Sequence, residues 1–268
     1  MSLPGRLVLL GHPVAHSLSP RFQNAALEAA GIPMVYEALD VPEAMLDETL
    51  RVLVATNGAG NVTIPHKEAV FAQCARRTPV AERVGAVNTF WVEDGALIGH
   101  NTDVGGFDAA VRHAFGVPPV GAVVAVLGAG GAAAACLAAV ERWPGASAFI
   151  ASRNIARADR LVARFARIAT RADDYAAAVL RADVVINATP LGLQGEPGPV
   201  DPAVLRRGTK VFDLVYQRGG TRWSLRARAR GLPAADGLRM LVEQGALSFE
   251  RWFGIAPDRE VMWGRVST

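Results

Sequence analysis

The sequence predicts an α/β protein with two α/β domains, and this inference rests on three observations. Short apolar segments alternate with amphipathic segments of helical period along nearly the whole chain, which is the pattern of strands covered by helices. Hydrophobic residues make up 51% of the 268 residues and charged residues 20%, so the chain can bury a substantial core. The stretch PPVG at 118–121 interrupts the alternation, and we expect a boundary between two halves there.

The first half contains apolar runs bounded by turn residues, each followed by a helical pattern. Strands are expected at 6–11, 34–39 and 60–65. Helices are expected at 19–31, 42–55, 66–75 and 104–116. The segment 86–103 differs, because it predicts two short strands joined by a hairpin turn at Asp94-Gly95.

The second half continues the alternation of strands and helices. Strands are expected at 122–128, 147–152, 183–189 and 209–216. Helices are expected in the alanine-rich stretch before Val140 and at 156–168, 176–182, 221–231 and 237–254. Because strands joined through helices form parallel sheets, we expect parallel sheets, with a cleft between the two domains as the place for a small-molecule site.

Charge and hydropathy argue against nucleic-acid and membrane partners. The net charge is only +3, and in the most arginine-rich stretch, Arg222–Gly231, arginines alternate with alanine and leucine like the solvated face of a helix. The uncharged run 117–140 is long enough to cross a bilayer. However, it opens with two prolines and contains four glycines, so a buried strand, a turn and a helix fit it better.

The cysteines and histidines predict a cytoplasmic protein without a metal site. Cys74 and Cys136 lie far apart in alanine-rich surroundings, which suits small core residues in a reducing compartment. The five histidines lack paired ligand spacing, and the N-terminal run LVLL is too short for a signal peptide.

A glycine-rich turn predicts a dinucleotide site in the second half. Gly128, Gly130 and Ala133 form the pattern G-x-G-x-x-A between a strand and a helix, where helix N–H groups can meet a pyrophosphate. Close packing of helix on strand is the alternative explanation for such glycines. The next strand ends at Arg153, followed by Arg157, where an NAD-selective site would have Asp or Glu. A guanidinium there suits a 2′-phosphate, so NADP(H) is the expected cofactor, with a plain surface arginine as the alternative.

Polar residues gather at the expected strand ends of the first half. Lys67 lies in the first turn of a helix, where the helix dipole disfavours a cation, although such a lysine commonly extends its ammonium into water. The other polar groups are Ser17 with Ser19, Asn88 and the run 101–103. Singly, each is explained as a helix cap or an exposed strand residue, with Ser19 as the cap of its helix. Together they lie on loops at the carboxyl ends of strands, where open parallel sheets bind ligands.

Eight motifs, in order and with similar spacing over nearly the whole chain, resemble the shikimate dehydrogenase family. They are GHPVAHSLSP, GNVTIPHKE, GAVNTF, GHNTD, GAGGAA, INATPLG, DLVY and GLRMLVEQGALSFERW. The resemblance implies reversible, NADP-dependent reduction of 3-dehydroshikimate to shikimate, on the chorismate route to aromatic amino acids. It implies a substrate-binding and catalytic domain at 1–103 plus 238–268, and a Rossmann-like NADP-binding domain at 104–237. The oligomeric state stays open, with a homodimer as one option.

The resemblance also assigns site residues by their positions in the motifs. Lys67 and Asp103 match the catalytic pair of the family, with Lys67 as proton donor or acceptor and Asp103 orienting it. The substrate contacts match Ser17, Ser19, Thr63, Asn88, Tyr216 and Gln244. The cofactor contacts match Gly128, Ala129, Gly130, Gly131, Ala132, Ser152, Arg153, Asn154, Arg157, Leu214 and Gly237.

The chain departs from the family pattern at three places, and two alternative functions stay open. Gln23-Asn24 replaces the usual His-Asn, Ser152-Arg153-Asn154 replaces Asn-Arg-Thr, and the stretch after Tyr216 lacks a proline. The alternatives are a quinate dehydrogenase or related paralogue, and a non-catalytic module that binds the metabolite and regulates a partner. The serines of SLS favour shikimate, and the presence of Lys67 and Asp103 favours an enzyme.

Overall fold

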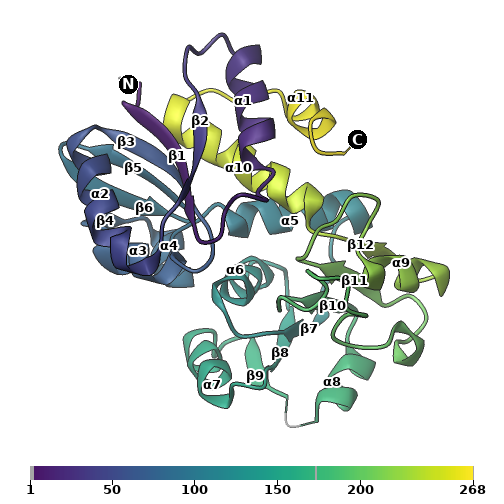
Figure 1. Ribbon diagram of the computed structural model, residues 1–268. Helices are drawn as coiled ribbons and strands as arrows, with labels where there is room; N and C mark the ends of the chain where they lie inside the picture. Colours follow the sequence, from purple (N-terminus) through teal and green to yellow (C-terminus); the bar gives the residue numbers. More distant parts are fainter. Residues whose placement is uncertain (1–2, 173, 268) are drawn as a thin grey trace. The chain divides into compact units, whose positions relative to one another are not determined.

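The computed structural model describes residues 3–172 and 174–267, which form two compact α/β units (Figure 1). Unit 1 consists of Met1–Gly106 with Leu241–Thr268, and unit 2 of Phe107–Met240. The chain passes from one unit to the other within α5 (Asp103–Phe115) and within α10 (Leu238–Phe253). The prediction of two α/β domains is confirmed, but the PPVG stretch lies inside unit 2 and is not their boundary.

Unit 1 is built on a mixed sheet with the strand order β2-β1-β3-β5-β6-β4. The strands are β1 (Arg6–Gly11), β2 (Tyr36–Asp40), β3 (Gly58–Val62), β4 (Arg76–Arg77), β5 (Thr89–Glu93) and β6 (Ala96–His100). β1 pairs in parallel with β2 and β3, whereas β5 pairs antiparallel with both β3 and β6. The parallel pairs of β1 agree with the expected alternation, and the antiparallel pair of β5 with β6 is the one that the predicted hairpin requires, whereas the antiparallel pair of β5 with β3 was not expected. The predicted hairpin reverses the chain at Asp94 and Gly95, whose φ angles of 54° and 72° suit a two-residue turn.

The helices of unit 1 follow local signals in the sequence. They are α1 (Ser19–Ala29), the 3₁₀ helix η1 (Glu43–Met45), α2 (Leu46–Ala55), α3 (Lys67–Gln73), α4 (Pro79–Val84) and α11 (Arg259–Gly264), with the first residues of α5 and most of α10. The Thr78 side chain caps α4 by accepting a hydrogen bond from the N–H of Ala81. Helices α4 and α11 and the two-residue β4 were not expected, because they are too short to show a periodic pattern.

Unit 2 contains a parallel sheet with the order β12-β11-β10-β7-β8-β9, which confirms the expectation for this half. The strands are β7 (Val123–Leu127), β8 (Ser147–Ala151), β9 (Ala169–Arg171), β10 (Val184–Asn187), β11 (Lys210–Asp213) and β12 (Ala234–Ala235), of which β9 and β12 were not expected. The helices are α6 (Gly131–Val140), α7 (Ile155–Arg164), α8 (Tyr175–Arg181), the 3₁₀ helix η2 (Pro202–Val204) and α9 (Arg222–Ala229), with the rest of α5. This is the strand order of doubly wound dinucleotide-binding sheets, with the switch point between β7 and β10.

The uncharged run 117–140 forms β7, a glycine turn and α6, as predicted. Residues 133–140 of α6 are all buried, and the alanines among them let the helix pack closely on the sheet. Cys136 lies among them and Cys74 in the core of unit 1, which confirms both as buried core residues. Within residues 3–172 and 174–267, no helix combines the length and apolarity needed to cross a membrane.

Candidate functional site

A lysine–aspartate pair stands at the centre of the polar residues of unit 1. Lys67 is the first residue of α3 and Asp103 the first residue of α5. The Lys67 ammonium donates a hydrogen bond of 2.6 Å to Asp103 Oδ2, with 21% of the lysine side chain and 7% of the aspartate side chain exposed. A charge-assisted hydrogen bond between partly buried groups is stronger than one between fully exposed groups. The structure therefore brings together the two residues that the resemblance assigns as the catalytic pair.

Asn88 holds the other oxygen of the Asp103 carboxylate. Its Nδ2 donates to Asp103 Oδ1 at 2.8 Å and also lies 2.9 Å from Thr102 Oγ1 and 3.1 Å from Gln244 Oε1. Its Oδ1 accepts a hydrogen bond of 2.7 Å from the backbone N–H of Thr102. Asn88 is 1% exposed, so these bonds form away from water. The predicted residues Asn88, Asp103 and Gln244 thus form one hydrogen-bonded group with Lys67.

The three polar side chains of the run 101–103 have different roles. Asn101 Oδ1 accepts a hydrogen bond of 3.1 Å from the N–H of Asp103, as a helix-capping side chain does. Because Asn101 caps the helix, the side chains of Thr102 and Asp103 do not have to, and both accept hydrogen bonds from Asn88 instead. The capping explanation therefore accounts for one of the three polar groups only.

A second layer of buried polar groups lies beneath the pair and was missed by sequence reasoning. Ser248 Oγ is 2.8 Å from both Asn61 Nδ2 and Thr89 Oγ1 and 3.1 Å from Thr102 Oγ1. Asn61 Oδ1 accepts a hydrogen bond of 2.8 Å from the Tyr36 hydroxyl. One signal could have found Ser248: it lies four residues after Gln244, on the same face of α10.

Ser17, Ser19 and Thr63 follow the carboxyl ends of β1 and β3, which are neighbouring parallel strands. The Ser17 hydroxyl accepts a hydrogen bond of 3.2 Å from the N–H of Ser19, and Ser19 is 5% exposed. Ser19 is the first residue of α1 and Leu18 precedes it as the N-cap, so the expectation that Ser19 caps the helix is wrong. Thr63 is partly buried, and its Cγ2 would collide with a Cβ at Gly11. Within residues 3–172 and 174–267, none of these three side chains is hydrogen-bonded to Lys67 or Asp103.

The glycine turn of unit 2 leaves the N-terminus of α6 open. Gly130 is the N-cap residue of α6 and supplies no side-chain cap, so it satisfies none of the first backbone N–H groups of the helix. A Cβ at Gly130 would meet no protein atom within 4 Å, whereas one at Gly128, with φ at +125°, would lie 2.5 Å from the carbonyl oxygen of Ala188. Packing therefore requires glycine at 128 but not at 130. The open position suits close approach of a ligand pyrophosphate, with Ala129, Gly131 and Ala132 beside it.

Ser152, Arg153, Asn154 and Arg157 follow β8, next to β7 in the sheet. Asn154 caps α7 by accepting a hydrogen bond of 3.0 Å from the N–H of Arg157, and Ser152 Oγ accepts one of 3.2 Å from the N–H of Asn154. Arg153 and Arg157 are exposed, and neither guanidinium has an ion-pair partner among the described residues. Two guanidinium groups are thus available to an anion at this strand end.

Leu214, Tyr216 and Gly237 follow the ends of β11 and β12 in unit 2. The N–H of Leu214 donates to the carbonyl of Asn187 at 3.0 Å, and the N–H of Gly237 donates to that of Val215 at 3.0 Å. A Cβ at Gly237 would collide with the carbonyl oxygen of Leu214. These bonds fix the backbone next to the switch point of the sheet.

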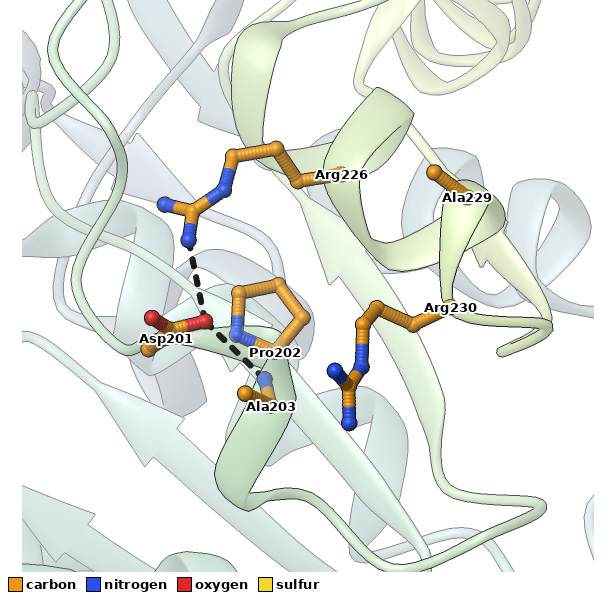
Figure 2. A pocket seen from close by; sticks show the side chains of 6 residues that line it. All are labelled: Asp201, Pro202, Ala203, Arg226, Ala229 and Arg230. Atoms are coloured by element: carbon orange, nitrogen blue, oxygen red, sulfur yellow. Dashed lines mark hydrogen bonds and ion pairs between the residues drawn. The ribbon is translucent and has the colours of Figure 1, made fainter.

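Figure 2 shows a hollow in unit 2 that contains none of the predicted site residues. It is lined by Asp201, Pro202, Ala203, Arg226, Ala229 and Arg230. Arg226 is paired with Asp201 at 3.0 Å, and Arg228 donates to the carbonyl of Ala234 at 3.0 Å. These two arginines of α9 thus bind other segments of their own unit, which agrees with the interpretation of a helix face that is not a nucleic-acid site. The described residues hold no cluster of three or more histidine, cysteine or acidic side chains that could bind a metal.

The folds and sites together define a class of two-domain α/β proteins that bind a dinucleotide. Residues 9–90 match the model of the shikimate dehydrogenase substrate binding domain, and residues 237–266 match the shikimate 5'-dehydrogenase C-terminal domain. The chain belongs to the shikimate dehydrogenase family.

Curated relatives and solved structures agree on this family. The chain is 44% identical to the shikimate dehydrogenase (NADP(+)) of Mesorhizobium japonicum, over 92% of this chain and 90% of the relative, and 44% identical to that of Rubrobacter xylanophilus, over 93% and 91%. The solved Thermus thermophilus shikimate 5-dehydrogenase in complex with NADP(H) and shikimate is 36% identical, with a TM-score of 0.87 over 97% of both chains. A quinate dehydrogenase from Corynebacterium glutamicum in complex with NAD is 28% identical, with a TM-score of 0.87 over 97% of both chains.

Proposed function

We propose that the protein catalyses the reversible NADPH-linked reduction of 3-dehydroshikimate to shikimate, with Lys67 moving the proton and Asp103 orienting it. The observation that carries this proposal is the 2.6 Å bond between Lys67 Nζ and Asp103 Oδ2. Membership of the family, whose curated relatives are named shikimate dehydrogenase (NADP(+)), supports it. On the same basis we place the reaction in chorismate and aromatic amino acid biosynthesis, in the cytoplasm.

The proton step belongs to Lys67. Bound NADPH would supply hydride to the carbonyl carbon of the ketone, and the negative charge that develops on the oxygen then needs a proton. A positioned acid typically contributes about 10²–10⁴-fold to such a step. An ammonium has three donors and Asp103 takes one, which leaves donors for the substrate oxygen. In the oxidative direction the neutral amine accepts the proton of the hydroxyl.

Asp103 acts by holding the ammonium in one place. Its Oδ2 accepts from Lys67 and its Oδ1 accepts from Asn88 at 2.8 Å, so the carboxylate cannot rotate without losing a bond. A fixed carboxylate fixes the lysine nitrogen. Orientation of this kind lowers the barrier because the reacting groups are already aligned.

The substrate contacts are proposed from the family motifs. Ser17 and Ser19 would hold the carboxylate of the substrate, and Thr63, Asn88 and Gln244 its ring hydroxyls, with Tyr216 as a further contact. The Asn88 amide has two protons and three acceptors within 3.1 Å. A ring hydroxyl would therefore replace the longest of them, Gln244 Oε1. A substrate without that hydroxyl would leave buried polar groups unpaired and be rejected.

The NADP contacts divide along the sheet of unit 2. Residues 128–132 would hold the pyrophosphate at the N-terminus of α6, where Gly130 leaves open space. Arg153 and Arg157, with Ser152 and Asn154, would hold the 2′-phosphate. Leu214 and Gly237 would contact the other half of the dinucleotide.

One absorbance assay tests this function against its closest rival. Shikimate and quinate are each oxidised with NADP⁺ and with NAD⁺, and four rates are compared. We expect shikimate with NADP⁺ to be fastest. Quinate oxidation is the second candidate because a solved quinate dehydrogenase shares the fold over 97% of both chains. Higher rates with quinate than with shikimate would show that the protein is a quinate dehydrogenase instead. Binding of shikimate without turnover would point to a non-catalytic module.

A further inference from the structure

Asp213 is a buried carboxylate for which the proposed function above has no role. It is the last residue of β11 and is 0% exposed. It accepts hydrogen bonds from Asn187 Nδ2 at 2.8 Å, from Thr221 Oγ1 at 2.7 Å and from the N–H of Val215 at 3.1 Å. Among the described residues, no cation forms an ion pair with it.

The charge of Asp213 is costly to the fold. The pKa of its carboxyl is raised to about 6, mainly by burial with a smaller contribution from the charge of Asp236, which together outweigh the lowering by the three hydrogen bonds. Relative to a usual aspartate, ionisation is therefore disfavoured by roughly a hundredfold. An asparagine could accept from Asn187 and Val215 through its oxygen and donate to Thr221, since a hydroxyl can also accept. The hydrogen bonds alone therefore do not require a charged residue.

The position of Asp213 assigns it to one half of the dinucleotide site. A doubly wound sheet binds one nucleotide over each half. The half with β7 and β8 carries the glycine turn and Arg153, so it takes the adenosine end. The nicotinamide end then falls to β10, β11 and β12. Asp213 ends the middle strand of these three, directly before Leu214.

The two redox forms of the cofactor differ in charge at this end. The nicotinamide ring is cationic in NADP⁺ and neutral in NADPH, whereas their phosphates are the same. A fixed buried anion near the ring therefore favours the oxidised form, and low dielectric strengthens the effect.

We propose that Asp213 is an electrostatic determinant of cofactor redox preference: its buried negative charge raises the affinity of unit 2 for NADP⁺ relative to NADPH. This inference rests on the proposed NADP-linked function. Other charged groups face the same region. Asp236 follows β12, Arg228 of α9 interacts with Asp236, and Glu196 binds the N–H groups of Gly192 and Gln194 in the loop after β10.

The test measures the dissociation constants of NADP⁺ and NADPH separately, without turnover, for the wild type, Asp213→Asn and Asp183→Asn. Asp183 is the control for loss of a carboxylate in unit 2: it also accepts a backbone N–H, from Val123 at 2.9 Å, but it is paired with Arg206 and precedes β10 instead of following β11. Because NADP⁺ and NADPH carry the same phosphates, the contribution of the phosphates to binding cancels in the ratio of the two constants. This includes the pH dependence of the 2′-phosphate, which titrates near pH 6. At pH 8 we expect D213N to weaken NADP⁺ relative to NADPH by about tenfold and D183N to leave the ratio unchanged.

The wild type supplies a second, independent measurement. Its ratio should move toward that of D213N as the pH falls from 8 to 5.5, whereas the ratio of D213N should stay flat. An unchanged ratio in D213N would overturn the proposal, even if both affinities fell together, as would a flat wild-type ratio. A ratio that still varies with pH in D213N would assign the effect to Asp236 instead. If the wild type binds neither NADP⁺ nor NADPH, the proposed NADP-linked function is itself refuted, and the proposal for Asp213 falls with it.

Discussion

Replacing Asp103 with asparagine tests the central pair most directly. The substitution keeps the shape of the side chain, but the single amide oxygen can face either Lys67 or Asn88, so one of these donors meets an amide N–H₂. A hydrogen bond to a charged group contributes about 1.5–3 kcal/mol. Since each 1.36 kcal/mol is tenfold in rate, D103N should lower kcat by roughly 10- to 100-fold if the bond acts in the transition state. The KM for shikimate should change much less.

The assay follows NADPH absorbance at saturating shikimate and NADP⁺, with thermal unfolding measured on the same samples. Asp108→Asn is the matched control, because Asp108 lies on the same helix and also accepts two side-chain bonds, from Arg112 at 2.7 Å and from Trp143 at 2.7 Å. A kcat for D103N within threefold of the wild type would refute the reasoning. An equal loss in D108N would show that the effect comes from α5 as a whole.

Three further predictions concern the cofactor, the buried network and pH. Arg153→Ala should weaken NADP⁺ binding about tenfold or more and NAD⁺ binding little, with Arg160→Ala as control; equal losses for both cofactors would contradict the 2′-phosphate role. Ser248→Ala should lower the free energy of unfolding by about 1–3 kcal/mol, measured with urea, because three buried partners lose a hydroxyl; an unchanged midpoint would argue against the network. The pKa of Asp213 is raised to about 6, so its carboxyl stabilises the fold at low pH and that contribution, up to about 3 kcal/mol, is lost as pH rises through 6. The difference in unfolding free energy between D213N and the wild type should therefore grow from pH 4 to pH 8, and a constant difference would contradict this.

Local patterns allowed much of the fold to be predicted. The glycine turn at Gly128 and the hairpin at Asp94-Gly95 each depend on a few consecutive residues, so the sequence alone carries their signal. The parallel sheet of unit 2 follows in the same way from strands separated by helices. In unit 1 the rule holds for β1, β2 and β3, whereas β5 runs antiparallel to both of its neighbours, β3 and β6, which makes the sheet mixed.

The buried network under the pair could not be predicted for a different reason. Asn61 bonds to Ser248 across 187 positions, and Tyr36 reaches Asn61 from another strand. Each of these residues has an ordinary local explanation, and only the register of β3 against β5 with the packing of α10 makes them neighbours. The identity of the pair, Lys67 and Asp103, could be predicted because the motifs around both residues resemble those of a known family. The distance between them and their hydrogen-bond partners could not be predicted in this way.

Lys67 raises the question of whether it gives a proton or only holds a charge. It starts α3, where a cation is disfavoured by up to about 1 kcal/mol, while Asp103 starts α5, where an anion is favoured by a similar amount. The ammonium therefore lies where its own helix disfavours a cation, and the hydrogen bond to Asp103 offsets that cost.

Arginine and alanine substitutions of Lys67 separate the two roles. The K67R variant would keep a positive charge and a hydrogen bond to Asp103, but a guanidinium cannot give up its proton near neutral pH. If Lys67 is the proton donor, K67R should lose nearly as much kcat as K67A, about 10²–10⁴-fold, while shikimate binding falls little. Binding is measured by calorimetry and kcat by NADPH absorbance. If K67R instead keeps its kcat within tenfold while K67A loses it, the charge alone does the work, and the proton must come from another group or from water.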